Sequence, residues 1–152
     1  MNLDTLGQVL VETELVVDPV RLELLAAAIG TDTAAETAAR VPFFGPTAAG
    51  QDSVIGPLDM DLRRALQGGQ SYEWHRSFVP GETVQLRITI EDILDKGAMQ
   101  LATVLSEYRD TTGALIQRQR TVFVEQSETT QEHGVEQSET TQEHGVEQSE
   151  TT

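Results

Sequence analysis

The residues best suited to acid–base chemistry in this sequence are its three histidines, His75, His133 and His144. A histidine side chain changes charge near neutral pH, so it can take and return a proton during a reaction. His133 and His144 lie in a repeated acidic segment, where we expect water to surround them. His75 follows Trp74 in a strand-like stretch, and it is either a catalytic base or a structural or surface histidine.

Aspartates are the other candidates for chemistry. Asp32 comes just past an expected helix end, so it is either a catalytic carboxylate or a turn residue. Asp59 and Asp61 invite a metal site, but side chains two positions apart on a helix point in different directions, and no histidine is near. Gly68-Gly69 is not a phosphate loop, because no Lys-Ser or Lys-Thr follows it. We expect neither a metal nor a cofactor, and the sequence assigns no substrate-binding residue.

The elements that position these residues belong to one domain, since 152 residues suit a single domain. Cysteine is absent, which excludes disulfides and thiol chemistry. The chain lacks a basic cluster, so nucleic acid and anionic membranes are poor partners for it. Its first residues do not resemble a secretory signal, and the longest apolar stretch, Leu24–Ile29, is too short to span a bilayer. A cytoplasmic protein is expected.

The acidic charge is concentrated at the end of the chain. Residues 125–152 contain eight Glu and no Lys or Arg, which leaves a net charge of −7 for 1–124. The sequence VEQSETTQEHG begins at Val124 and repeats at Val135, and each repeat offers one valine to a core. We therefore expect a domain over 1–124 and a disordered tail over 125–152. Deleting 126–152 should leave the melting temperature of the domain nearly unchanged.

The first half of the chain predicts one strand and several helices. A β-rich stretch covers 8–17, and a helix over 19–29 follows, capped by Asp18 and ended by Gly30. Its apolar residues are distributed over most of the circumference of the helix, so we expect the helix to be buried on most sides. A short helix is expected over 33–40. After an irregular segment rich in proline and glycine, another short helix is expected over 57–67.

The second half of the chain predicts an antiparallel meander of three strands. Apolar and polar residues alternate over 84–91, 99–108 and 115–124, with turns at 95–97 and 110–113 between them. A sheet with one apolar face needs a cover, and the helix over 19–29 is the longest apolar element. The predicted fold is therefore α+β, with a curved antiparallel sheet wrapped around one central helix, the hot-dog arrangement.

The segment from Tyr72 to Glu82, YEWHRSFVPGE, resembles the aromatic-x-aromatic-His-Arg-x-x-x-x-Gly-Asp signature of the MaoC-like N-terminal dehydratases, which include fatty-acid-synthase-type dehydratases. The helix end before Asp32 and the proline-rich segment over 42–57 are similar to that family as well. This resemblance covers about 5–124. It implies the hot-dog fold and a hydratase or dehydratase acting on an acyl thioester of CoA or acyl carrier protein.

One position departs from the pattern of active members. The resemblance implies an Asp followed five residues later by a His, and counting from Asp32 leads to Thr37. Threonine is a poor base at neutral pH. The first hypothesis is thus an accessory, substrate-binding subunit of a 3-hydroxyacyl-thioester dehydratase, paired with a MaoC-type partner that carries the dyad. Backbone N–H groups near a helix N-terminus would hold the thioester carbonyl.

Two alternatives remain open. One is a non-catalytic module that binds acyl thioesters, and the other is a homodimeric hydratase with a relocated dyad such as Asp32 and His75. A dimer, with an identical or a different chain, is expected in either case. One helix of about 11 residues cannot cover a sheet of five or more strands, so another chain must cover what it leaves open.

Overall fold

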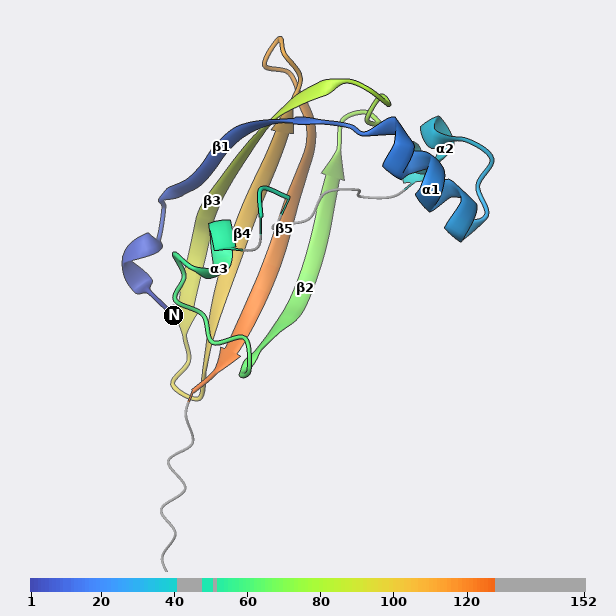
Figure 1. The fold of residues 1–152 in the computed structure, drawn as a ribbon. Coiled ribbons are helices and arrows are strands. Elements are labelled where there is room, and N and C mark those ends of the chain that lie inside the picture. The colour runs from blue at the N-terminus through green and yellow to red at the C-terminus, as the bar shows by residue number, and fades with distance from the viewer. Residues whose placement is uncertain (41–47, 51, 128–152) are drawn as a thin grey trace, which may run out of the picture.

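A computed structural model describes residues 1–40, 48–50 and 52–127 of the chain. Its main element is an antiparallel sheet of five strands in the order β1-β3-β4-β5-β2. Figure 1 shows a long curved sheet with α1 and α2 beyond one end and α3 over one face. The elements in chain order are η1 (Leu3–Thr5), β1 (Val9–Val16), α1 (Pro19–Ile29), α2 (Ala34–Arg40), α3 (Asp52–Ile55), β2 (Ala65–Trp74), β3 (Thr83–Asp95), β4 (Met99–Arg109) and β5 (Leu115–Gln126).

The predicted meander is confirmed as β3, β4 and β5, which pair in sequence order. The alternation in β3 has the expected meaning, because Leu86 and Ile88 are buried whereas Arg87 between them is exposed. We call the face that carries Leu86 the inner face and the opposite one the outer face. Asp110 fixes the second turn, where its Oδ1 accepts hydrogen bonds from the N–H groups of Thr112, at 2.9 Å, and Ala114, at 3.0 Å.

The prediction of a helix over 57–67 is wrong, because turns occupy most of 56–64 and β2 begins at Ala65. Strand β2 pairs with β5, and their register shifts between Gln67 and Gly69. A Cβ atom at Gly68 would lie 2.6 Å from Cγ2 of Val124. Glycine therefore permits the close approach of the two strands, and it does not end a helix here.

The bounds of the helix over 19–29 are confirmed by α1. The side chain of Asp18 accepts a hydrogen bond from the N–H of Val20 at 2.9 Å, and Pro19 occupies the first position of the helix. Gly30 ends the helix in the left-handed conformation, with φ of 78°. These are the capping residues that the sequence indicated.

The expected burial of α1 on most sides is wrong. Only Leu22 and Ala26 are buried, whereas Val20, Leu24 and Ile29 are 66%, 68% and 48% exposed. The helix packs against α2 at one end of the sheet and does not lie along the inner face (Figure 1). The reason is that another segment covers the apolar side chains of the sheet.

That segment surrounds α3. Val54, Leu58 and Met60 are buried and belong to the same apolar cluster as the inner-face residues of the sheet. Figure 1 shows α3 in front of the middle strands. The buried apolar residues of this cluster are Val17, Leu22, Ala34, Ala38, Val54, Leu58, Met60, Phe78, Val84, Leu86, Ile88, Ile90, Ala102, Val104, Tyr108 and Ile116.

The folded chain continues past the expected boundary at residue 124. Glu125 is buried within β5, and Nη2 of Arg64 lies 3.2 Å from its Oε1. The N–H of Gln126 donates to the carbonyl of Arg64, and that of Ser127 donates to the carbonyl of Ala98. Residues 128–152, with the two tail histidines, lie outside the described residues. No helix in the described ranges is both long and apolar enough to cross a membrane.

Candidate functional site

Asp32 lies in the short connection between α1 and α2, and its side chain is exposed. Its backbone N–H donates a hydrogen bond to Oε2 of Glu36 at 3.2 Å. The first turn of α2 is engaged in a similar way, because the N–H of Ala34 donates to Glu23 and that of Glu36 donates to Oγ1 of Thr33. These two amides are therefore not available to a substrate carbonyl.

Thr37, the position at which the pattern of active members has histidine, is fully buried in α2. Its Oγ1 donates to the carbonyl oxygen of Thr33 at 3.0 Å and lies 2.6 Å from Oγ1 of Thr31. A neutral hydroxyl with two such neighbours holds the start of α2 in place. It has neither the pKa nor the exposure of a general base.

His75 lies directly after β2, and its side chain is 46% exposed. Its Nε2 lies 2.9 Å from Oε1 of Glu73, which also pairs with Arg118 at 3.1 Å. The hydrogen bond from His75 lowers the pKa of Glu73, and Arg118 lowers it further. Among the described residues, no hydrogen bond or ion pair joins His75 to Asp32. The relocated dyad stays a prediction.

Glu73 belongs to a row of alternating charges on the outer face, and this row crosses all five strands of the sheet. The row runs through residues that are directly paired in the sheet: Glu12, Arg87, Glu107, Arg118 and Glu73. Arg118 lies 3.0 Å from Glu107, and Arg87 lies 3.5 Å from Glu12. Such cross-strand pairs at the surface each contribute about 0.2–1 kcal/mol, so the row stabilises the sheet modestly.

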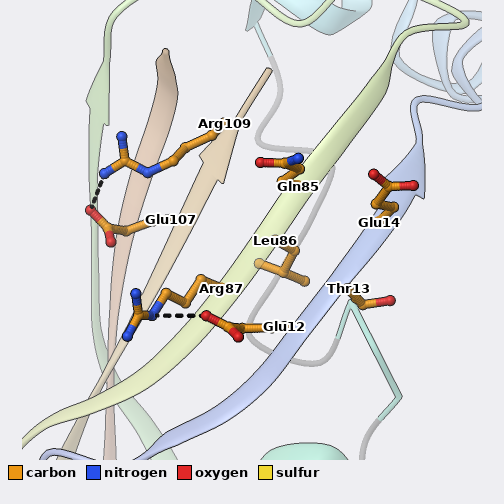
Figure 2. A pocket seen from close by; sticks show the side chains of 8 residues that line it. All are labelled: Glu12, Thr13, Glu14, Gln85, Leu86, Arg87, Glu107 and Arg109. Atoms are coloured by element: carbon orange, nitrogen blue, oxygen red, sulfur yellow. Dashed lines mark hydrogen bonds and ion pairs between the residues drawn. The ribbon is translucent and has the colours of Figure 1, made fainter. Parts of the chain in front are cut away.

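A groove of about 440 Å³ lies on this row between β1, β3 and β4 (Figure 2). Its two cations are Arg87 and Arg109, and each lies beside a carboxylate, Glu12 at 3.5 Å and Glu107 at 3.3 Å. Because Glu14 adds a further negative charge, the groove does not favour the phosphate groups of a CoA or carrier-protein thioester.

The charged residues of the signature segment 72–82 have a structural role. The guanidinium of Arg76 forms a two-fold pair with Glu82, at 2.9 and 2.8 Å, and the N–H of Val79 donates to the same carboxylate at 2.6 Å. Gly81 takes φ of 84°, and its N–H donates to the carbonyl of Val17. Burial raises the pKa of Glu82, but the bonds from Arg76 and Val79 outweigh burial and lower this pKa.

Two aromatic residues of the signature, Trp74 and Phe78, contribute to an aromatic cluster. Phe78 is buried and stacks edge-on against Trp74 and Tyr108, with ring centroids 5.9 and 5.6 Å away. Burial raises the pKa of Tyr108 far above its ordinary value, so its phenol stays neutral. Trp74 is 38% exposed, which brings the cluster to the edge of the sheet at β2.

Next to this cluster the inner face turns polar along β5, where Gln117 and Gln119 are fully buried. Gln117 pairs with Tyr108 on one side and with Trp74 on the other. Nε2 of Gln119 donates to Oε1 of Gln117. Sequence reasoning missed these amides. The signal was the run Gln-Arg-Gln-Arg over 117–120, which makes both faces of a strand polar.

Residues 27–119 match the family model of the FAS1-like, dehydratase domain region, which is more than half of the chain. No curated protein sequence matches the chain. Similar solved structures include a MaoC-like dehydratase from Phytophthora capsici, with a TM-score of 0.61 and 19% identity over 85% of this chain and 50% of that one.

Two further structures are complexes from Mycobacterium tuberculosis. The C-terminally truncated HadBC complex, a 3R-hydroxyacyl-ACP dehydratase, has a TM-score of 0.57 and 16% identity, over 82% of this chain and 99% of that one. The ChsH1–ChsH2 complex has a TM-score of 0.54 and 14% identity, over 80% and 88%. At these identities the likeness concerns the fold, and it confirms the predicted hot-dog fold.

Proposed function

This chain belongs to the FAS1-like dehydratase domain region family, within the MaoC-like hot-dog dehydratases, and we propose that it is the accessory half of a two-subunit enzyme. The reaction would be the reversible addition of water to a 2-enoyl thioester of CoA or acyl carrier protein, or its loss from the 3-hydroxyacyl form. The chain would form part of the acyl-binding wall, and its partner would supply the Asp and His.

The buried Thr37 is the observation that carries this proposal. A hydratase needs a base that can accept a proton near neutral pH, and the Thr37 hydroxyl cannot do this. His75 is engaged by Glu73 on the outer face, away from the inner-face cluster where an acyl chain would find apolar surface. The N–H groups of Ala34 and Glu36 are also occupied, so we infer that the partner holds the thioester carbonyl.

The exposed side of α1 supports a partner chain. Val20, Leu24 and Ile29 present apolar side chains to water on one short helix, and such surface is usually covered in an assembly. HadBC and ChsH1–ChsH2, each with a chain whose fold resembles this one, are complexes of two subunits. A heterodimer with a MaoC-type subunit therefore fits this chain better than a free monomer.

The test is reconstitution with a MaoC-type subunit from the same host that carries the Asp and His pair. We expect co-elution in size-exclusion chromatography with light scattering, and hydration of crotonyl-CoA by the mixture. Leu24→Glu on α1 should abolish co-elution, whereas the matched control Leu62→Glu, which alters a leucine 51% exposed in a turn, should not. The absence of both co-elution and activity with every such subunit would contradict the proposal.

A non-catalytic acyl-thioester-binding module is the second candidate, and the same Thr37 favours it. It differs in needing no catalytic partner, and it would act alone or as a homodimer of this chain. Binding of acyl-CoA with unchanged affinity in the presence of every MaoC-type subunit, and without turnover, would favour this module over the enzyme subunit.

A further inference from the structure

The inner face of β5 carries a row of buried polar side chains, and the neighbouring strands add Ser106, paired with Gln119, and Gln70, paired with Thr121. Gln117, Gln119 and Thr121 are buried there in alternation. At the same level, β3 presents Leu86 and Ile88 to the inner face. Sequences place amides inside a sheet only where partners satisfy them, because desolvating an unpaired amide is costly.

Thr121 has a partner, since its hydroxyl donates to Oε1 of Gln70 on β2 at 2.7 Å. The two other amides satisfy each other only in part. Nε2 of Gln119 donates to Oε1 of Gln117, which leaves Nε2 of Gln117 and Oε1 of Gln119 without a partner. Exchanging oxygen and nitrogen in both amides would leave the same result, one open donor and one open acceptor in the pair.

A hydroxyl group matches this pair of open atoms. It accepts one hydrogen bond through its oxygen and donates another through its hydrogen, so a single hydroxyl can satisfy both amides. An unsubstituted hydrocarbon chain satisfies neither. A carbonyl or an ether oxygen satisfies only the donor of Gln117.

The amide pair also lies one strand away from the edge of the sheet. Strand β2 forms the edge of the sheet, and its Tyr72 and Trp74 pair directly with Gln119 and Gln117. These aromatic side chains are 42% and 38% exposed. Tyr72 and Trp74 therefore place partly exposed aromatic surface on the inner face directly beside the two amides.

We propose that the Gln117–Gln119 pair selects acyl thioesters whose acyl chain carries a hydroxyl group additional to the one formed or lost in the reaction. This inference rests on the proposed function, because it assigns the substrate class of the same acyl-binding wall. A site built to hydrogen-bond a hydroxyl discriminates strongly against the analogue that lacks it, since the buried groups are then left unpaired.

The test is calorimetric binding to the full chain, using octanoyl-CoA and its isomers with a hydroxyl at carbons 4 to 8. We expect at least one isomer to bind about tenfold or more tightly than octanoyl-CoA. In the Gln117→Met/Gln119→Met double variant, this preference should vanish while octanoyl-CoA binds at least as tightly. The control Gln85→Met, on the exposed outer face of β3, should keep the preference.

The outcomes separate this inference from the proposed function. Equal binding of octanoyl-CoA and every hydroxylated isomer would overturn the inference, with the two amides then satisfied by water, and would leave the proposed function standing. A preference that survives in the double variant would overturn it too, because the hydroxyl would bind elsewhere. Binding of no acyl-CoA by this chain would overturn the inference and would leave the proposed function standing, because there the partner holds the thioester carbonyl.

Discussion

The stability of the domain should rise when both buried glutamines are replaced by apolar residues of similar length. The wild-type pair Gln117 and Gln119 buries two unpaired polar atoms and makes one hydrogen bond. Gln119→Met removes that bond but leaves both polar atoms of the Gln117 amide unpaired. Because an unpaired buried group costs about 1–3 kcal/mol and a hydrogen bond contributes about 1 kcal/mol, the single variant should stay within about 1 kcal/mol of wild type.

The double variant Gln117→Met/Gln119→Met buries no unpaired amide at all. We expect it to gain about 2 kcal/mol in the free energy of unfolding, which raises the melting temperature by roughly 6–8 °C for a domain of this size. Urea unfolding monitored by Trp74 fluorescence, with the wild type, both single variants and the double variant, measures the coupling between the two sites. A double variant less stable than wild type by the sum of its singles would refute the reasoning. The gain would carry a functional cost if the pair binds a ligand.

The remaining predictions concern backbone approach, pH and the chain end. Gly68→Ala should lower the free energy of unfolding in urea by about 1–2 kcal/mol, because its Cβ would lie 2.6 Å from Val124. The control Gly69→Ala, whose Cβ would have its nearest contact at 3.8 Å, should leave that free energy nearly unchanged. Equal effects of the two substitutions would contradict this prediction. The pKa of Glu82 is lowered from its ordinary 4.5, so the stability that it contributes is present above pH 4.5 and is lost as the pH falls through the folded-state value. Wild type should therefore lose more stability than Glu82→Gln between about pH 5 and 3, and parallel acid-unfolding curves would refute this. Deleting 128–152 should shift the melting temperature by less than about 2 °C, and a larger drop would mean that the tail packs on the body.

Local signals in the sequence predicted the elements whose ends are fixed by capping and turn residues. Asp18, Pro19 and Gly30 gave the bounds of α1, and strict alternation gave the meander that starts at β3. The burial of α1 could not be predicted in this way. Its apolar residues indicate that some surface must cover them, but not whether that surface is the sheet or another chain.

The wrong helix over 57–67 has a similar cause. Leu58, Leu62 and Leu66 follow helical spacing, yet Leu58 packs in the core, whereas Leu62 lies in a turn and Leu66 in β2. Periodicity over one short window does not separate these cases. The close approach of Gly68 to Val124 decides for a strand, and it depends on a pairing between distant parts of the chain.

The candidate site was predicted only in part. The sequence singled out Asp32 and His75 by residue type, and the signature segment led to Trp74 and Phe78, which lie in the aromatic cluster. The residue type of Gln117 and Gln119 did not indicate burial, because glutamine is common on exposed strand faces. Their burial depends on which face of β5 is covered, and a strand that is polar on both faces signals a buried polar side chain without telling which face is covered.

Hydration of crotonyl-CoA by the purified chain alone is the measurement that tests the accessory role most directly. We predict no hydration above the uncatalysed rate, because Thr37 replaces the base and His75 is paired with Glu73. Asp32→Asn and His75→Gln should leave that result unchanged. Hydration by the chain alone, lost in either of these two variants, would contradict the account and establish a self-sufficient hydratase with a relocated dyad.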